Sequence, residues 1–420
     1  MYDLILKGAR LLDGGLRDFA IRDGRFVKIA PTISEESREV FDCHGMTILP
    51  PFCNAHTHAA MVLLRGYADD LPLFPWLQEH IWPAEARLTA EDVSAGVRLA
   101  ILEMIKSGTV FFNDSYFFLP ETIAVVEEMG VRACIGLTCM DVGDAAARER
   151  RNAENRAIRQ NYLEGRYSRR VRVAYSPHAI YTVNEETLRQ IAEESARDGM
   201  LVHAHLAETK QEFLDCQKNH GGLTPFEYIE ECGLLNDRAR FAHCVWMTDG
   251  DREKAAAAGA VLIHNPTSNL KLCSGVFQHA AAQKAGCRIA LGTDGCASNN
   301  AHSLFSEMKV AALSGKMAAK DPTVCPAETV FQWATKSMEY FVPDSGEIAE
   351  GKVADAMLLD LDQPYLVGDY HLISNLVYAG ESSCVDTVLC DGKLLMKHRQ
   401  VPGEETILRD ARRVCDKFRR

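Results

Sequence analysis

No apolar run in the 420-residue sequence approaches the roughly 20 residues that a membrane-spanning helix needs, so we expect no membrane partner. The first residues do not combine a basic segment with an apolar one, as a secretory signal peptide would, and we expect a cytoplasmic protein. Positive charge is not in excess, since 46 Lys and Arg stand against 58 Asp and Glu and give a net charge of −12. Domains that bind the phosphate backbone of nucleic acids are usually basic, so we expect no nucleic-acid partner.

The fourteen cysteines include no C-x-x-C pair, which argues against a zinc ribbon or a thioredoxin-like site. Several of them, such as Cys134 and Cys244, lie in apolar segments, and we interpret them as reduced, buried side chains. The sequence also has no H-E-x-x-H, P-loop, G-x-S-x-G or P-C-x-x-C motif. A deaminase of the cytidine-deaminase type is therefore excluded.

The two ends of the chain alternate apolar and polar residues and are interrupted by glycine-containing turns. Residues 1–47 predict short antiparallel strands, with an Asp-Gly turn at Asp23-Gly24. Residues 351–362 and 384–400 repeat this pattern, again with an Asp-Gly turn. We expect the two β-rich ends to pair into one small β-sandwich domain.

The middle of the chain alternates helices with short apolar strands. Thr89 and Asp92 have the spacing of a capping box at the start of one such helix. Eight strands are expected, at residues 48–52, 109–113, 131–138, 170–176, 200–207, 238–245, 259–265 and 287–293. Strands that are apolar throughout and alternate with helices indicate an α/β protein with a parallel sheet, and eight of them indicate a closed, TIM-like (β/α)8 barrel. We place the barrel at 49–345, and the two parts of the β domain at 1–48 and 346–420, the latter with a terminal helix.

Polar residues gather where these strands end, which is where such barrels carry their active sites. They are His56, His58, Asn113, Asp114, His178, His205, Glu208, His243, His264, Asn265 and Asp294. His56 and His58 share one face of an extended chain and can hold one metal ion. Taken singly, a strand histidine is more often a hydrogen-bonded core residue, and Asp294 could simply begin an Asp-Gly turn. Their joint placement at one rim favours a metal site.

Five motifs in this order resemble the amidohydrolase superfamily, and in particular its amino-purine deaminase and chlorohydrolase branch. They are NAHTH (54–58), HAHLAETKQE (203–212), AHCVWM (242–247), HNPTSNLKL (264–272) and LGTDGCASNN (291–300). The resemblance covers nearly the whole chain and implies a metal-dependent hydrolase barrel with a split β domain. The segment PWLQEHIWPAE (75–85) resembles the one that 5′-methylthioadenosine/S-adenosylhomocysteine deaminases use against the nucleoside.

The resemblance implies four ligands to one divalent metal ion, which are His56, His58, His205 and Asp294. Three imidazoles and a carboxylate suit Zn²⁺, with Fe²⁺ as the alternative. In HAHLAE the ligand is the histidine three positions before the glutamate, which leaves His203 as a packed or supporting residue. Residues 170–176 contain no lysine, so we predict one metal ion and no carboxylated lysine bridging two.

The resemblance also assigns the catalytic roles. Glu208 would protonate a ring nitrogen of the substrate, and His243 would hydrogen-bond the attacking water. Asp294 would take the first proton from that water. Around the metal, Glu85 would accept hydrogen bonds from the ribose hydroxyls and His178 would make a second polar contact.

Two further substrate contacts have equally plain structural interpretations. Trp76 would form an apolar wall of the site, or is simply a core aromatic residue. An S-adenosylhomocysteine carboxylate needs a cation, and the third strand, with IGLTCM, offers no arginine. Arg148 and Arg150 in the next segment are the candidates, although such a charged run is usually a solvated helix face.

We therefore predict a homo-oligomeric, metal-dependent hydrolytic deaminase that acts on a small purine-type molecule. It would convert an adenosine-type nucleoside (5′-methylthioadenosine, S-adenosylhomocysteine or adenosine) into the inosine analogue and ammonia. The alternative on the same scaffold is a deaminase of a free base (guanine, 8-oxoguanine or a pterin) or a triazine hydrolase. Ring-opening amide hydrolases usually carry the bridging lysine that is missing here, and a non-catalytic binding protein would be expected to lose part of the site.

Overall fold

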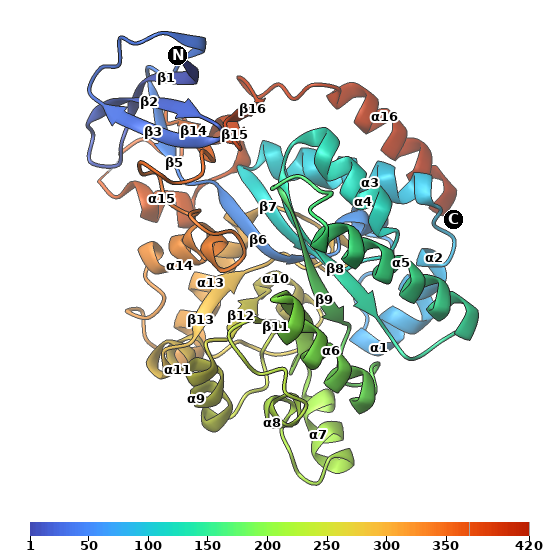
Figure 1. Cartoon of the computed structure of the whole chain (residues 1–420). Helices are drawn as coiled ribbons and strands as arrows, with labels where there is room; N and C mark the ends of the chain where they lie inside the picture. The colour runs from blue at the N-terminus through green and yellow to red at the C-terminus, as the bar shows by residue number, and fades with distance from the viewer. Residues whose placement is uncertain (369, 420) are drawn as a thin grey trace.

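The computed structural model describes residues 1–368 and 370–419, which form an eight-stranded barrel and a separate eight-stranded sheet (Figure 1). The barrel strands are β6 (Phe52–Thr57), β7 (Thr109–Asp114), β8 (Arg132–Cys139), β9 (Val171–Pro177), β10 (Leu201–Leu206), β11 (Ala239–His243), β12 (Val261–His264) and β13 (Arg288–Leu291). Each strand pairs in parallel with the next along the chain, and β13 packs against β6, which nearly closes the barrel. The predicted (β/α)8 barrel is confirmed.

Helices surround the barrel and follow most of its strands. The longer ones are α3 (Ala90–Lys106), α4 (Leu119–Met129), α5 (Ala145–Leu163), α6 (Glu185–Asp198), α7 (Lys210–Asn219), α8 (Pro225–Glu231), α9 (Asp249–Ala258), α11 (His279–Ala285), α13 (Leu304–Ala319) and α14 (Ala327–Ala334). The predicted capping box is present at the start of α3, where Thr89 and Asp92 satisfy each other's backbone N–H groups. Among the described residues, no helix has the length and apolar character that crossing a membrane requires.

Short helical segments line the rim of the barrel and fill the connections. They are η1 (Ala59–Leu64), α1 (Leu73–Pro75), the π-helix η2 (Trp76–Ile81), α2 (Trp82–Glu85), α10 (Pro266–Lys271), α12 (Cys296–Asn299), η3 (Lys336–Tyr340), η4 (Ser382–Cys384) and η5 (Asp416–Phe418). The segment from α1 to α2 is a run of three short helices. A π-helix is rare and often accompanies a functional site, and this one supplies Trp76 to the cavity described below.

The second sheet is built from both ends of the chain, as predicted. Its strands are β1 (Tyr2–Arg10), β2 (Leu16–Arg22), β3 (Arg25–Ala30), β4 (Ser37–Asp42), β5 (Met46–Leu49), β14 (Ala356–Asp360), β15 (Val385–Cys390) and β16 (Lys393–Met396). Antiparallel pairing of β5 with β14 joins the two ends into one mixed sheet. The Asp-Gly turn between β2 and β3 has positive φ at both residues, 51° at Asp23 and 69° at Gly24, as a tight hairpin requires.

Two details of the strand prediction were wrong. The apolar run 48–52 is not one barrel strand, because its two prolines separate β5, which belongs to the end sheet, from β6, which begins at Phe52. Proline lacks the N–H that a continuous ladder needs, so the strand is interrupted there. In addition, β4 and β5 pair in parallel with β1, whereas antiparallel strands were expected throughout this region.

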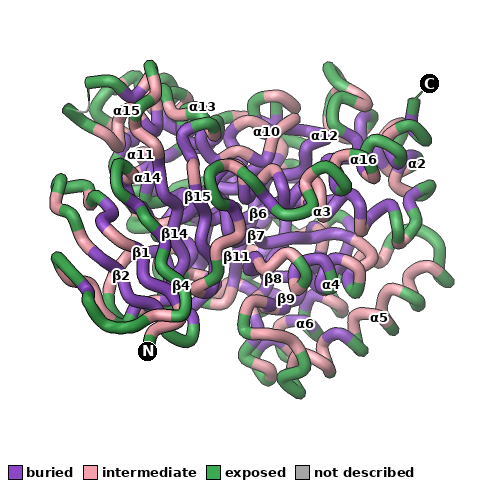
Figure 2. Tube along the Cα trace, turned by 90° about the horizontal axis from the view of Figure 1, so that it is seen from above, coloured by how far each residue is buried: buried purple, intermediate pink, exposed green. Residues whose placement is uncertain are grey.

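The barrel and the end sheet share one apolar core. A single cluster of buried residues contains the barrel strands together with Met357, Leu359 and Val388 of the end sheet. Figure 2 shows the buried trace concentrated on the strands and the exposed trace on the outer turns. The C-terminal helix α16 (Glu404–Cys415) packs along α3, and α15 (Leu372–Tyr378) packs against α14.

A buried ion cluster also joins the two parts. Arg132, at the start of β8 and 1% exposed, donates to Asp355 from Nε at 2.7 Å and to Asp391 from Nη2 at 2.9 Å. Both aspartates belong to the C-terminal part of the chain. The partner of a buried charge must be present, so this cluster fixes how the barrel meets the end sheet.

Candidate active site

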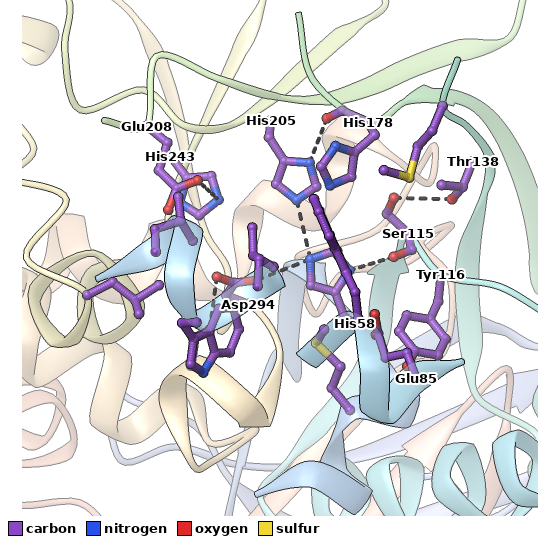
Figure 3. A pocket seen from close by; sticks show the side chains of 18 of the residues that line it. His58, Glu85, Ser115, Tyr116, Thr138, His178, His205, Glu208, His243 and Asp294 are labelled. Atoms are coloured by element: carbon purple, nitrogen blue, oxygen red, sulfur yellow. Dashed lines mark hydrogen bonds and ion pairs between the residues drawn. The ribbon is translucent and has the colours of Figure 1, made fainter. Parts of the chain in front are cut away.

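Four predicted metal ligands lie at the carboxyl ends of the barrel strands, and Figure 3 shows His58, His205 and Asp294 among them. His56 lies on β6, His58 follows that strand, His205 lies on β10, and Asp294 follows β13. Asp294 Oδ1 lies 3.3 Å from His56 Nε2 and 3.2 Å from His58 Nε2. His58 Nε2 lies 3.3 Å from His205 Nε2. The ligand atoms of His56, His58 and Asp294 all lie within 4.8 Å of one another, and so do those of His56, His205 and His243.

The hydrogen bonds of the histidines leave the right nitrogen free for a metal. His205 Nδ1 lies 2.7 Å from the carbonyl oxygen of His178, and His58 Nδ1 contacts the carbonyl oxygen of Ser115. A carbonyl can only accept, so both Nδ1 atoms carry a proton, and in the neutral form of each ring the Nε2 atom carries the lone pair. The lone pairs therefore face the other ligands, which is the tautomer that a metal site needs.

His56 reaches the same state through His203. His203 Nδ1 donates to the carbonyl of Arg240 at 2.9 Å, so its Nε2 must accept from His56 Nδ1 at 2.8 Å. His56 Nε2 is buried and has no hydrogen-bond partner among the described residues. Burial lowers the pKa of His56 to about 4, which keeps the ring neutral. A buried, neutral, unpartnered imidazole nitrogen beside a carboxylate fits a divalent metal such as Zn²⁺.

Asp294 is held in one orientation. Its Oδ2 accepts hydrogen bonds from the hydroxyls of Ser268 at 2.7 Å and Ser298 at 3.1 Å. Its Oδ1 accepts from the N–H of Gly295 at 2.8 Å and faces the histidines. The backbone of Asp294 has a positive φ of 61°, which is unusual for a residue other than glycine.

Glu208 and His243 stand side by side next to the ligands (Figure 3). Glu208 Oε2 lies 3.7 Å from His243 Nε2, and Glu208 Oε1 accepts from the hydroxyl of Ser274 at 3.2 Å. His243 Nδ1 donates to Asn269 Oδ1 at 2.8 Å, so its Nε2 lone pair faces the site. Burial raises the pKa of Glu208, so this carboxyl can hold a proton and donate it. The pair therefore offers one proton donor and one acceptor beside the metal site.

These groups open into one cavity at the rim of the barrel. Its walls are largely aromatic and apolar, with Trp76, Trp82, Tyr116, Phe117 and Tyr181. No lysine or arginine is among the described residues that line it. The cavity suits a flat, uncharged ring system.

Glu85 and His178 supply polar groups to this cavity. Glu85 Oε1 is buried and makes no hydrogen bond of ordinary geometry within the described residues. Burial raises the pKa of Glu85 to about 7, against smaller opposite effects of Tyr116 and His58. His178 Nδ1 lies 2.9 Å from the Thr182 hydroxyl. That hydroxyl gives its own proton to a carbonyl, so His178 Nε2 is left as an acceptor.

The structure does not bring Arg148 and Arg150 to the cavity. Arg148 Nη1 donates to the carbonyl of Asp141 at 2.7 Å, and Arg150 is exposed on α5. Both lie on α5, a long helix whose charged side chains largely face solvent and on which only Ile158 is fully buried. The interpretation of these two arginines as carboxylate ligands is therefore corrected.

Several residues that support the site were not predicted. Ser268 and Ser298 contact Asp294, and Asn269 contacts His243. All three lie inside the motifs given above, so the residues themselves could be identified from the sequence. Their contacts could not be predicted, because Ser268 and Asn269 meet residues at the ends of other strands and the contact of Ser298 depends on how the loop after β13 folds.

The chain was compared with known proteins. Residues 47–395 match the model of the amidohydrolase family. The 5′-deoxyadenosine deaminase of Methanothermobacter thermautotrophicus is 41% identical over 401 residues, which cover 94% of this chain and 93% of the relative. The 5-methylthioadenosine/S-adenosylhomocysteine deaminase of Thermococcus sibiricus is 39% identical over 382 residues, covering 90% and 89%. A solved adenosine deaminase from Xanthomonas campestris with bound zinc has a TM-score of 0.93 at 33% identity, over 99% of this chain and 98% of that chain.

Proposed function

From the premise that this chain belongs to the amidohydrolase family, we propose that it deaminates adenosine-type nucleosides whose 5′ group is small and uncharged. Examples are 5′-deoxyadenosine, 5′-methylthioadenosine and adenosine. The reaction replaces the exocyclic amino group by oxygen, and water and the nucleoside give the inosine analogue and ammonia. The names of the relatives support this substrate class.

The observation that carries the proposal is the buried Oε1 atom of Glu85 in the cavity wall, which has no hydrogen-bond partner among the described residues. A carboxylate can accept hydrogen bonds from two vicinal hydroxyls, which a ribose supplies and a free base lacks. A free base would leave this buried oxygen without a partner, and an unsatisfied buried polar atom is costly. We therefore favour a nucleoside over guanine, a pterin or a triazine.

His56, His58, His205 and Asp294 would hold the metal ion, and zinc is our proposal because the Xanthomonas campestris enzyme binds it. When bound, such a cation lowers the pKa of a water molecule from 15.7 to about 7 and so makes a nucleophile available at neutral pH. The protein contributes the rest of the chemistry through groups whose positions are fixed by hydrogen bonds.

The contacts of each catalytic side chain match its role in proton transfer or hydrogen bonding. Glu208, whose pKa is raised by burial, donates a proton to the ring nitrogen next to the carbon under attack. His243 Nε2 accepts a hydrogen bond from the attacking water, because Asn269 holds the proton on the opposite nitrogen. Asp294 Oδ1 accepts a proton from the water and returns it to the departing ammonia, while its Oδ2 stays bound to two serines.

Because the described cavity wall contains no cation, we propose that the 5′ group of the substrate cannot carry a carboxylate. A homocysteine carboxylate would need an arginine or a lysine to replace its hydration. Arg148 is bound to a carbonyl oxygen, as described above. Arg151 donates from Nη2 to the carbonyl of Met140 at 3.0 Å. We therefore propose that S-adenosylhomocysteine is a poor substrate.

Ammonia release from a substrate panel tests the proposal. The panel holds 5′-deoxyadenosine, 5′-methylthioadenosine, adenosine, S-adenosylhomocysteine, guanine, 8-oxoguanine and a pterin, each offered to protein loaded with zinc and, separately, with iron. We expect the first three compounds to have the highest kcat/KM. A free base ahead of every nucleoside would overturn the substrate class and leave the hydrolytic chemistry in place.

A further inference from the structure

Four helices of the barrel begin with a threonine followed three residues later by an acidic residue. The pairs are Thr89 and Asp92 in α3, Thr209 and Glu212 in α7, Thr224 and Glu227 in α8, and Thr248 and Asp251 in α9. In α3, α8 and α9 the acidic side chain returns to the backbone N–H of its threonine and completes a capping box. This is the usual function of such a residue.

Glu212 in α7 makes a different set of contacts. The hydroxyl of Thr209 accepts from the N–H of Glu212 at 3.1 Å, as in a capping box. The carboxylate of Glu212, however, reaches further back along the chain. Its Oε1 accepts from the N–H of Ala207 at 2.9 Å, and its Oε2 accepts from the N–H of Glu208 at 2.8 Å. One side chain therefore binds both residues that precede Thr209.

These two residues form the turn that carries the catalytic acid. Ala207 has a φ of 53°, in the left-handed region that side chains other than glycine rarely adopt. Its carbonyl accepts from the N–H groups of Val245 and Trp246, each at 2.9 Å. The turn is thus held from one side by the loop after β11 and from the other by Glu212. Both attachments fix the direction in which Glu208 leaves the backbone.

Glu212 is 4% exposed and is not among the residues that line the cavity. No lysine or arginine of the described chain forms an ion pair with it, so the two N–H groups are its main partners. Burying a carboxylate without a cation is unfavourable unless its hydrogen bonds are needed where they are. Capping a helix does not require the acidic side chain to be buried, since Glu227 caps α8 from a more exposed position.

We propose that Glu212 is a positioning residue for catalysis, which holds the Ala207–Glu208 turn so that the Glu208 carboxyl points at the reacting ring. The proposal rests on the proposed role of Glu208 as the proton donor. Glu212 acts through Glu208 and does not itself touch the substrate.

The test is Glu212→Gln in the metal-loaded enzyme, with Glu227→Gln as the matched control. Glutamine keeps the size of the side chain but can accept only one of the two N–H groups, and its own NH₂ faces the other. We expect kcat to fall roughly 10- to 100-fold, the effect of losing a hydrogen bond to a charged group. KM and metal content should stay within about two-fold of the parent enzyme, because Glu212 contacts neither ligand nor substrate. Glu227→Gln should lower thermal stability and leave kcat unchanged.

A double-mutant cycle separates positioning from general weakening of the fold. If Glu212 acts through Glu208, Glu212→Gln should have almost no effect on kcat in a Glu208→Gln background. Ala207→Gly should restore part of the lost kcat in the Glu212→Gln enzyme, since glycine adopts the left-handed conformation without strain. If Glu212→Gln does not accumulate as folded protein, Glu212→Asp gives the same comparison, because the shorter side chain cannot reach both N–H groups.

An unchanged kcat in Glu212→Gln, an equal loss in the Glu208→Gln background, or an equal loss in Glu227→Gln would each overturn the proposal. Its failure is distinct from failure of the proposed substrate class. If the panel identifies a free base, the same ratios are measured with that base, and the expectation for Glu212 is unchanged.

Discussion

His203 Nε2 accepts a hydrogen bond from His56 Nδ1 at 2.8 Å, and this contact decides which nitrogen of His56 faces the metal site. His203 can accept there only because its own Nδ1 donates to the carbonyl of Arg240. The tautomer of the ligand is therefore set by a carbonyl on β11 and relayed through a second imidazole. Such supporting contacts commonly change metal affinity by about 10- to 100-fold.

We predict that His203→Phe lowers zinc affinity by about 10- to 100-fold, because the His56 ring loses the acceptor that orients it. The measurement is competition for zinc with a chromophoric chelator. The control is His220→Phe, which changes a histidine stacked on Tyr228 away from the site. Equal zinc affinity in the two variants would show that the His203 contact does not support the ligand.

Glu85→Gln should selectively lower kcat/KM for nucleosides. Its amide can accept only one ribose hydroxyl and carries no charge, so we expect kcat/KM for adenosine-type nucleosides to fall about 100-fold, two hydrogen bonds to a charged group being affected. A 2′,3′-dideoxy analogue offers no such hydroxyls and should lose less than about three-fold. Steady-state ammonia release with both compounds decides the matter. A similar loss for both would place Glu85 in some other role.

Arg132→Met should destabilise the protein by about 3–5 kcal/mol, because it leaves Asp355 buried without a cation and removes the most buried cation that Asp391 binds. Arg169→Met is the control. Arg169 also binds Asp391, but its side chain is 56% exposed, and an exposed pair contributes about 1 kcal/mol or less. Urea unfolding of the two variants provides the comparison. Equal destabilisation would mean that burial does not distinguish the two pairs.

Much of the architecture could be predicted from the sequence because its signals are local. The alternation of helices with apolar strands requires only neighbouring residues, and it predicted the barrel. The apolar run 48–52 misled for the same reason. Apolar character alone does not show that Pro50 and Pro51 end one strand before the next begins in another sheet. The direction of the strands in the end sheet could not be predicted either, because apolar and polar residues alternate in the same way in parallel and antiparallel strands.

The candidate site shows the same difference between features that local sequence predicts and contacts that form only in the folded chain. The residues with distinctive chemistry, such as His56 and Asp294, stand in motifs that can be read directly from the sequence. The contacts that orient them do not, because Ser268 meets Asp294 only after two strands have closed into the barrel. Glu212 shows the limit most clearly. Its T-x-x-E spacing predicts a capping box, and only the folded turn reveals that its carboxylate binds two other N–H groups.

Acid should destabilise the protein through a histidine far from the catalytic chemistry. His279 is 1% exposed, stacks on Trp333, and has no hydrogen-bond partner for either ring nitrogen among the described residues. Burial lowers its pKa from 6.5 to about 4. Between these values the unfolded chain binds more protons than the folded one, so stability is lost as the pH falls below about 6.5.

We expect His279→Phe to keep the ring stacking and remove this titration. Between pH 7 and pH 5 the free energy of unfolding of the parent should fall by about 2 kcal/mol more than that of the variant, since one pH unit corresponds to about 1.4 kcal/mol. Urea unfolding at the two pH values measures the difference, and metal-linked effects common to both proteins cancel. His371→Phe, at a side chain 75% exposed, should behave like the parent. A parallel fall in parent and His279→Phe would contradict the expectation.

The missing cation at the 5′ end of the cavity gives a gain-of-function prediction. Met140 lines the cavity, and its unbranched side chain is close in length to that of arginine. Met140→Arg would place a guanidinium where the described wall has no positive charge, and arginine binds a carboxylate through two parallel hydrogen bonds. We expect kcat/KM for S-adenosylhomocysteine to rise about 10- to 100-fold, with that for 5′-methylthioadenosine unchanged or lower. Met140→Gln has a similar length without charge, so it should raise neither value. If the parent enzyme already turns over S-adenosylhomocysteine as fast as 5′-methylthioadenosine, the cavity must hold the carboxylate without a cation, and the proposed limit on the 5′ group is wrong.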